Sequence, residues 1–262
     1  MKLPIYQADA FTDHVFGGNP AAVCPLETWL PDELMQHIAM ENNLSETAFF
    51  VKEGEAYHLR WFTPAVEVDL CGHATLATAH IMFTELGFEG NEIHFNTKSG
   101  ELIVSRTVEG YKMDFPAEEM PQVQEPPQLF QALGIQRTSY TYKSDDVMVV
   151  LGSEKEVAEL NPNFNLLKEV EARGVIVTAP GDEVDFVSRF FAPQSGIDED
   201  PVTGSAHTKL APLWAKTLGK TELTARQISE RVGDLRISLK GDRVEIFGQA
   251  QTFLRGEIIL PD

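Results

Sequence analysis

Two stretches of this chain resemble each other and lie about half its length apart. Residues 60–80 read RWFTPAVEVDLCGHATLATAH, and residues 189–209 read RFFAPQSGIDEDPVTGSAHTK. Aligned without gaps, they share an arginine, a phenylalanine, a proline, an aspartate and an alanine at an offset of 129 positions (189 minus 60) in 262 residues. Internal repetition on this scale predicts a duplicated architecture. We expect two similar α/β halves packed face to face, with the active site in the cleft between them.

Residues 116–127, PAEEMPQVQEPP, indicate where the halves meet, because they are rich in proline and acidic residues like a linker. We predict an N-terminal half over 1–116 and a C-terminal half over 117–251. Whether the last strand, at about 252–262, completes the first half is left open. Periodicity and start signals predict helices over 32–42, 73–86 and 202–218. Strands are expected over 2–9, 21–25, 47–52, 55–63, 92–97, 101–107, 110–115, 146–151, 174–179, 184–191, 235–239, 243–248 and 251–259.

The charge balance narrows the range of partners. With 40 acidic and 21 basic residues the chain carries a net charge of −19, which disfavours binding to nucleic acid or to an anionic membrane surface. The N-terminal stretch MKLPIYQADAFTDH lacks the apolar core of a secretory signal. No apolar run approaches the roughly 18 residues of a membrane span. We therefore expect a cytoplasmic protein.

The chain has two cysteines, Cys24 and Cys71, and no CxxC motif. This pattern supports neither a disulfide framework nor a structural zinc site. Cys24 lies in the apolar AAVCPL and is expected in the core. A racemase can use two thiols on opposite faces of a carbon. The gapless repeat instead places Asp200 opposite Cys71, so a two-thiol mechanism is disfavoured.

Each repeat copy leads into a helix that begins with small residues, at 72–75 and at 203–206. Helix N-termini leave unpaired N–H groups and a partial positive charge, so both are candidate sites for a substrate carboxylate. Asp200 precedes Pro201, a combination that predicts a helix cap. His73 follows the other helix start, where the dipole favours a neutral imidazole. Taken alone, both residues have ordinary structural explanations.

Glu46 in NNLSETAFF is a candidate general acid/base. It lies between the end of a predicted helix and an apolar strand, where a partly buried carboxyl can exchange protons with a substrate. Taken alone, Ser45-Glu46 is more typical of a surface turn.

Four motifs together carry a resemblance to a known family. They are DAFTDHVFGGNPAAV at 9–23, SETAFF at 45–50, FTPAVEVDLCGHATLATAH at 62–80 and FFAPQSGIDEDPVTGSAH at 190–207. With these motifs the chain resembles the PhzF (phenazine biosynthesis-like) family, which has the diaminopimelate epimerase-like fold. The resemblance implies the α+β class, with each half a curved sheet around a central helix.

The resemblance also implies a function and a set of site residues. Such proteins are cofactor-free isomerases, usually homodimers, that act on small anionic substrates without a metal. Glu46 resembles the family's general acid/base, and His73 and Asp200 resemble groups that orient the substrate or Glu46. The residues implied in substrate binding are Asn19, Gly72, His73, Ala74, Gly204 and Ser205.

Three functions stay open from the sequence. The first is a cofactor-independent isomerase in which Glu46 moves a proton on a carboxylate-bearing substrate. The second is an amino-acid epimerase or racemase in which Cys71 is an alternative acid/base with Asp200 or Glu46. The third is a binding or regulatory protein that turns over no substrate.

Overall fold

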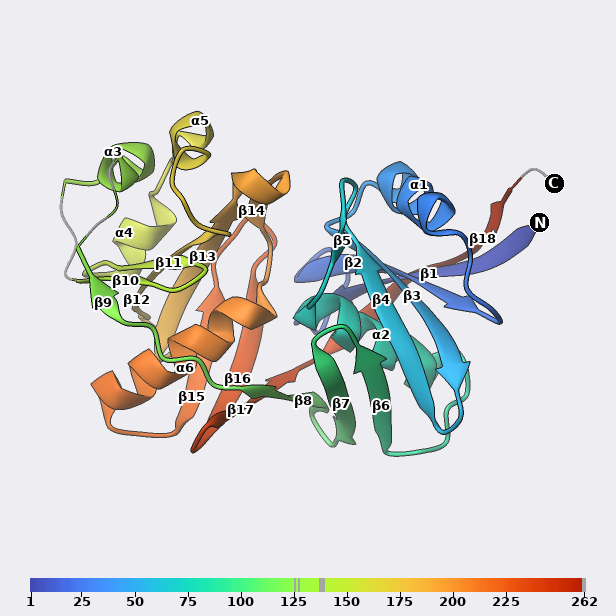
Figure 1. Ribbon diagram of the computed structural model, residues 1–262. Coiled ribbons are helices and arrows are strands. Elements are labelled where there is room, and N and C mark those ends of the chain that lie inside the picture. Colours follow the sequence, from blue (N-terminus) through green and yellow to red (C-terminus); the bar gives the residue numbers. More distant parts are fainter. Residues whose placement is uncertain (125, 127, 137–139, 261–262) are drawn as a thin grey trace. The chain divides into compact units, whose positions relative to one another are not determined.

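The computed structural model describes residues 1–124, 126, 128–136 and 140–260 (Figure 1). The chain divides into two compact units. Unit 1 comprises Met1–Phe115 together with the segment from Glu245 onward, and unit 2 comprises Pro116–Val244. The segment predicted as a linker contributes a short strand to unit 2, and its residues 125 and 127 lie outside the described residues.

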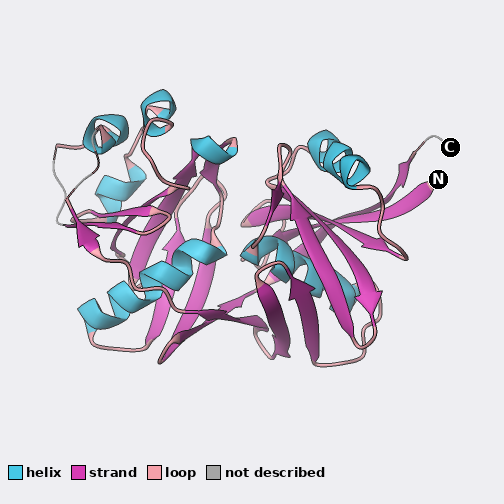
Figure 2. Ribbon diagram, in the orientation of Figure 1, coloured by secondary structure: helices cyan, strands magenta, loops and turns pink. Residues whose placement is uncertain are grey.

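Unit 1 is a sheet that wraps around one helix. Helix α2 (Gly72–Thr84) is buried along almost its whole length, because its side chains are mostly small or apolar on every face. It packs against strands from both ends of the strand order, including β18, β1, β2, β3 and β7. The second helix, α1 (Asp32–Asn42), covers the outside of β3 and β4 (Figure 2). The strands are β1 (Lys2–Ala10), β2 (Asn19–Leu26), β3 (Glu46–Glu53), β4 (Ala56–Phe62), β5 (Glu67–Val68), β6 (Glu92–Thr97), β7 (Gly100–Thr107), β8 (Gly110–Pro116) and β18 (Ala250–Ile259).

Unit 2 has its own sheet and its own long helix, α6 (Gly204–Leu218). Its main apolar core brings Val149, Val177 and Phe191 together with the short helices. The other helices are α3 (Leu129–Leu133), α4 (Glu154–Ala158), α5 (Phe164–Leu167) and the 3-10 turn Pro193–Ser195. The strands are β9 (Gln122–Val123), β10 (Tyr140–Lys143), β11 (Val147–Val150), β12 (Val175–Pro180), β13 (Phe186–Ala192), β14 (Ile197–Asp200), β15 (Glu222–Gln227), β16 (Gly233–Lys240) and β17 (Arg243–Gly248), the last of which crosses into unit 1.

The two units repeat one topology, which confirms the prediction of two similar α/β halves. In unit 1, β1 and β2 are antiparallel, β2 and β3 parallel, β3 and β4 antiparallel, β4 and β6 parallel, and β6 and β7 antiparallel. In unit 2, the series β10, β11, β12, β13, β15 and β16 shows the same alternation. Several elements were not predicted. β14 has only four residues, too few for a clear periodicity. β15 was missed although its six residues alternate between buried and more exposed positions.

The structural repeat is not gapless, and this corrects the sequence alignment. In both units an arginine lies over a phenylalanine ring and binds a glutamate with two hydrogen bonds, as Arg60 does with Glu67 and Arg189 with Glu199. The arginines are 129 positions apart, whereas the glutamates are 132 apart. The 3-10 turn Pro193–Ser195 lies between them in the second copy and accommodates the three extra residues.

In the described part of the chain, no helix has both the length and the apolar character needed to cross a membrane.

Candidate active site

The N-terminal end of α2 gathers residues from two neighbouring strands of unit 1. Asn19 opens β2 and Glu46 opens β3. Because these strands run parallel, with Ala21 opposite Glu46, both side chains lie at the same end of the sheet. The turn before Asn19 requires Gly18, whose φ is +58° and where a Cβ would come within 2.0 Å of the Ala10 carbonyl oxygen. This local geometry brings Asn19 to the start of α2.

Cys71 and His73 complete the cluster from the helix itself. Cys71 is the N-cap residue of α2 in extended conformation, and His73 lies in the first turn. Both are buried, and Asn19 is completely buried. The structure thus brings together the predicted residues Asn19, Glu46, Cys71 and His73, and Gly72 and Ala74 flank them in α2.

His73 is the centre of this cluster. Its Nε2 lies 3.1 Å from Glu46 Oε2, although the two atoms are not aligned as a regular hydrogen bond. Neither atom has a hydrogen-bond partner elsewhere in the described residues. On the other side of the ring, Nδ1 lies 3.1 Å from Asn19 Nδ2 and 3.5 Å from Cys71 Sγ. The carboxyl and the thiol therefore face different nitrogens of one imidazole.

The buried environment sets the protonation of Cys71 and His73. Burial, and then the Glu46 carboxylate, raises the pKa of the Cys71 thiol to about 11 despite the opposing effect of His73. Burial disfavours a charge on His73, but Cys71 and Glu46 outweigh it and raise its pKa well above the usual range. This direction runs against the expectation of a neutral imidazole. Near neutral pH Cys71 is a thiol and carries no charge, so the Glu46 carboxylate is the neighbour that favours a proton on His73.

Three of these residues also have the composition of a cation site. Glu46, Cys71 and His73 each offer one ligand atom, and these atoms lie within 4.8 Å of one another. Carboxylate, thiolate and imidazole are all zinc ligands. The sequence did not indicate this grouping, because Glu46 is distant in the chain from the other two.

Asp200, predicted to cap α6, does not cap it. The N-cap residue is Thr203, and Asp200 ends β14 three positions earlier. The Asp200 carboxylate instead accepts a hydrogen bond of 2.5 Å from the Thr203 hydroxyl. Gln227 joins the two residues, since its Nε2 donates to Asp200 O at 2.6 Å and its Oε1 accepts from Thr203 N at 2.8 Å. The corrected repeat therefore pairs Cys71 with Thr203. The two residues are 132 positions apart, and each is the N-cap of its helix.

Ser205 belongs to an ionic network that the sequence analysis missed. Its hydroxyl accepts a hydrogen bond of 3.2 Å from Arg173, whose guanidinium binds the fully buried Asp146 at 2.5 and 3.0 Å. Lys209, also buried, contacts Asp146 at 2.6 Å and binds Asp145. Two cations thus face at least two carboxylates in this network.

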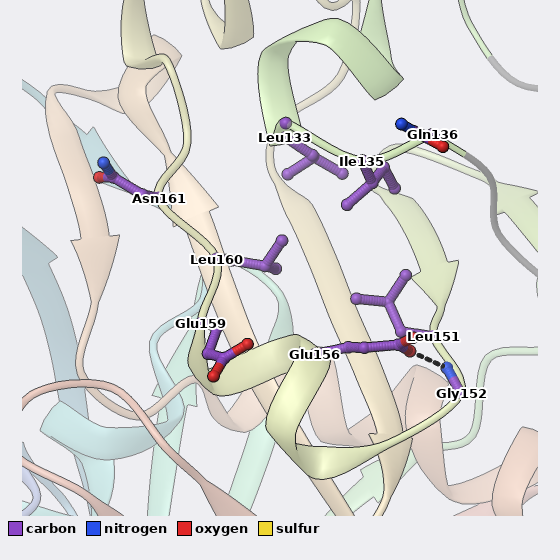
Figure 3. Close-up of a pocket in the computed structure, with 10 residues that line it drawn as sticks. Leu133, Ile135, Gln136, Leu151, Gly152, Glu156, Glu159, Leu160 and Asn161 are labelled. Atoms are coloured by element: carbon purple, nitrogen blue, oxygen red, sulfur yellow. Dashed lines mark hydrogen bonds between the residues drawn. The ribbon is translucent and has the colours of Figure 1, made fainter.

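The structure also contains a pocket that holds none of the predicted site residues. In unit 2 a cavity of about 780 Å³ lies between α3 and α4 (Figure 3). Its walls include Leu133, Ile135, Leu151 and Leu160. The Glu156 carboxylate at its edge accepts a hydrogen bond of 2.7 Å from the Gly152 amide. This cavity offers no pair of facing acid and base groups.

The fold of the repeated α/β units also occurs in proteins of very different sequence. A solved structure of a probable proline racemase from Agrobacterium radiobacter superposes with a TM-score of 0.68 at 10% identity, over 99% of this chain and 93% of that one. At this identity the likeness concerns the fold alone.

The family follows from a closer comparison. The family model described as phenazine biosynthesis-like protein (PhzC-PhzF) matches residues 8–256, and the chain belongs to this family. A Pseudomonas aeruginosa protein named as an uncharacterized isomerase is 52% identical, over 99% of this chain and 100% of that protein. The crystal structure of a PhzF family protein from Enterococcus faecalis is 50% identical, with a TM-score of 0.95 over 99% of this chain and all of that one.

Proposed function

We propose that the protein is a cofactor-independent isomerase that moves a proton on a small carboxylate-bearing substrate, with Glu46 as the general acid/base. The printed names of its relatives support an isomerase in general terms. The observation that carries the proposal is the Glu46–His73 pair, whose buried atoms Oε2 and Nε2 are 3.1 Å apart and make no other hydrogen bond within the described residues. Buried polar atoms without partners are rare in folded proteins and often mark functional groups.

The proposed reaction is a proton transfer through Glu46. The carboxylate takes a proton from one carbon of the substrate and returns it to another, so no oxidant or reductant is needed. His73, held as an imidazolium beside Glu46, supplies a positive charge next to the electron-rich intermediate. A positioned acid/base contributes about 10²–10⁴-fold to such a reaction.

Cys71 is a weaker candidate for the base. A thiol with a pKa of about 11 is almost entirely protonated near neutral pH, and its sulfur faces Nδ1 of His73. In the epimerase alternative, Cys71 is the acid/base. Substrate binding would then have to lower the pKa of this thiol by a large amount. Thr203, the counterpart of Cys71 in the corrected repeat, cannot act as a second thiol.

We also propose the remaining contacts that the family resemblance implies. In this proposal Asn19, Gly72, Ala74, Gly204 and Ser205 bind the substrate, and Asp200 orients it. The same resemblance leads us to propose a homodimer, which the molar mass from light scattering tests. The sequence analysis leads us to propose a cytoplasmic location.

The proposal is tested by deuterium uptake from D2O into a panel of small carboxylates, including amino acids and dihydro-hydroxyanthranilate. We expect the wild-type protein to exchange a carbon-bound hydrogen of at least one compound, and Glu46→Gln to lose this exchange while remaining folded. A compound that binds in calorimetry but takes up no deuterium with any variant would instead support the binding or regulatory function.

A further inference from the structure

We propose that Glu46, Cys71 and His73 form a binding site for a thiophilic divalent cation, for which Zn²⁺ is the best match. The ion would bind Glu46 and His73, which the proposed isomerase also uses. Only this overlap between the cation site and the active site rests on the proposed function. Cation binding itself depends only on the geometry of unit 1.

The spacing of two ligand atoms already fits a zinc ion. Zinc binds imidazole nitrogen at about 2.0–2.1 Å and carboxylate oxygen at about 2.0–2.2 Å, so a tetrahedral ion holds these atoms about 3.4 Å apart. His73 Nε2 and Glu46 Oε2 are 3.1 Å apart. A small outward movement of the carboxylate therefore makes room for an ion between them.

The same two atoms lack other partners. Nε2 and Oε2 are buried and make no hydrogen bond within the described residues, and His73 is 3% exposed. Leaving a buried polar atom without a hydrogen bond is unfavourable. A cation bound by both atoms would satisfy both at once.

Cys71 supplies the soft third ligand. Its Sγ lies 3.5 Å from Nδ1 of the ring, and one ligand atom of each of the three residues lies within 4.8 Å of the others. As the zinc–sulfur bond forms, the thiol proton passes to the solvent, and a proton on Nε2 does the same. The thiolate and the Glu46 carboxylate together balance the two charges of the ion.

Asn19 completes the arrangement from the far side of the ring. Its amide lies 3.1 Å from Nδ1. With Oδ1 turned toward the ring, the amide would accept the hydrogen on Nδ1 of a ligating histidine and fix the ring, as polar partners of metal-bound histidines usually do. Three protein ligands leave the fourth position of a tetrahedral ion open, as in zinc sites that also accept water or small molecules.

The experiment is a titration of the full-length, chelator-treated protein with Co²⁺, followed by absorption. We expect one Co²⁺ per chain with a thiolate-to-cobalt charge-transfer band, and displacement of that Co²⁺ by Zn²⁺. Cys71→Ala should lose the band. The matched control is Cys24→Ala, since Cys24 is also buried and free but lies in the apolar core beside Met35 and Phe49. This control should keep the band.

Two further variants keep the test decisive if Cys71→Ala fails to fold. Glu46→Gln and Asn19→Ala should each weaken Co²⁺ binding at least tenfold while the charge-transfer band remains at saturation. Absence of the band in the wild type, or an unchanged band in Cys71→Ala, would overturn the proposal. Because no substrate is used, failure here leaves the isomerase untouched, and absence of deuterium uptake leaves the cation site untouched.

Discussion

Helices α2 and α6 occupy the same place in the topology of the two units, yet their N-termini hold different kinds of cluster. At α2, Glu46 Oε2 and His73 Nε2 face each other with no other hydrogen bond. At α6, by contrast, the buried Asp146 is bound by both Arg173 and Lys209.

The two helix starts nevertheless correspond. Both N-cap residues are extended, Cys71 with φ −145° and ψ 109° and Thr203 with φ −114° and ψ 99°. In each helix a side chain four residues later donates to the N-cap carbonyl: Thr75 Oγ1 to Cys71 O at 2.6 Å, and His207 Nδ1 to Thr203 O at 2.8 Å. These bonds correspond in the repeat, 132 positions apart. The comparison teaches that the duplicated fold fixes where a site can form, while the side chains decide whether it is reactive or structural.

The largest effect is expected at the α2 cluster. Glu46→Gln keeps the size of the side chain but removes the carboxylate, so we expect deuterium uptake to fall about 10²–10⁴-fold. Glu53→Gln is the matched control, because Glu53 ends the same strand and is exposed. Mass spectrometry of the product measures both rates, and an equal loss in the two variants would contradict a specific role for Glu46.

At α6, removal of a carboxylate should lower the free energy of unfolding. Asp146→Asn leaves the buried Lys209 and the partly buried Arg173 without their shared carboxylate, and breaking a buried ion pair costs about 3–5 kcal/mol. Asp145→Asn is the control, since Asp145 also binds Lys209 but is largely exposed. Urea unfolding should show a much smaller loss for Asp145→Asn, and equal losses would argue against the buried network as the main source of stability.

The pH dependence of the free energy of unfolding should also distinguish the two helices, by a smaller effect. Burial lowers the pKa of His207 from 6.5 to about 4. The unfolded chain therefore takes up this proton first, and stability falls as the pH drops from 6.5 toward 4, by about 3 kcal/mol at ~1.4 kcal/mol per pKa unit. For His73 the raised pKa has the opposite sign, so its contribution is complete below 6.5 and is lost as the pH rises through the folded pKa.

Unfolding curves of two variants separate these contributions. His207→Gln should flatten the acid side of the stability profile, and His73→Gln should flatten the side above pH 6.5. If either variant left its side of the profile unchanged, the assigned protonation state of that histidine would be wrong.

The sequence predicted the architecture better than the details of the site. The repeat was strong enough to predict two similar halves, and helix 32–42 has the predicted bounds because Pro31 and the apolar spacing mark it. The cap role of Asp200 was wrong because Asp200 ends β14 and α6 begins only after Thr203, which the Asp-Pro pair does not show. The pairing of Cys71 with Asp200 was wrong because a gapless alignment cannot show the three extra residues at 193–195. Arg173 and Lys209 were missed because they lie 27 and 63 positions from Asp146, and local patterns do not report such pairings.

The most direct test of the central claim compares Glu46→Gln with Cys71→Ser in the same D2O exchange assay. If Glu46 is the acid/base and Cys71 stays a thiol, Glu46→Gln loses deuterium uptake. Cys71→Ser then retains uptake within about tenfold, which corresponds to a change of ~1.4 kcal/mol in the barrier. Uptake that survives Glu46→Gln and disappears in Cys71→Ser would contradict this account and identify a thiol epimerase.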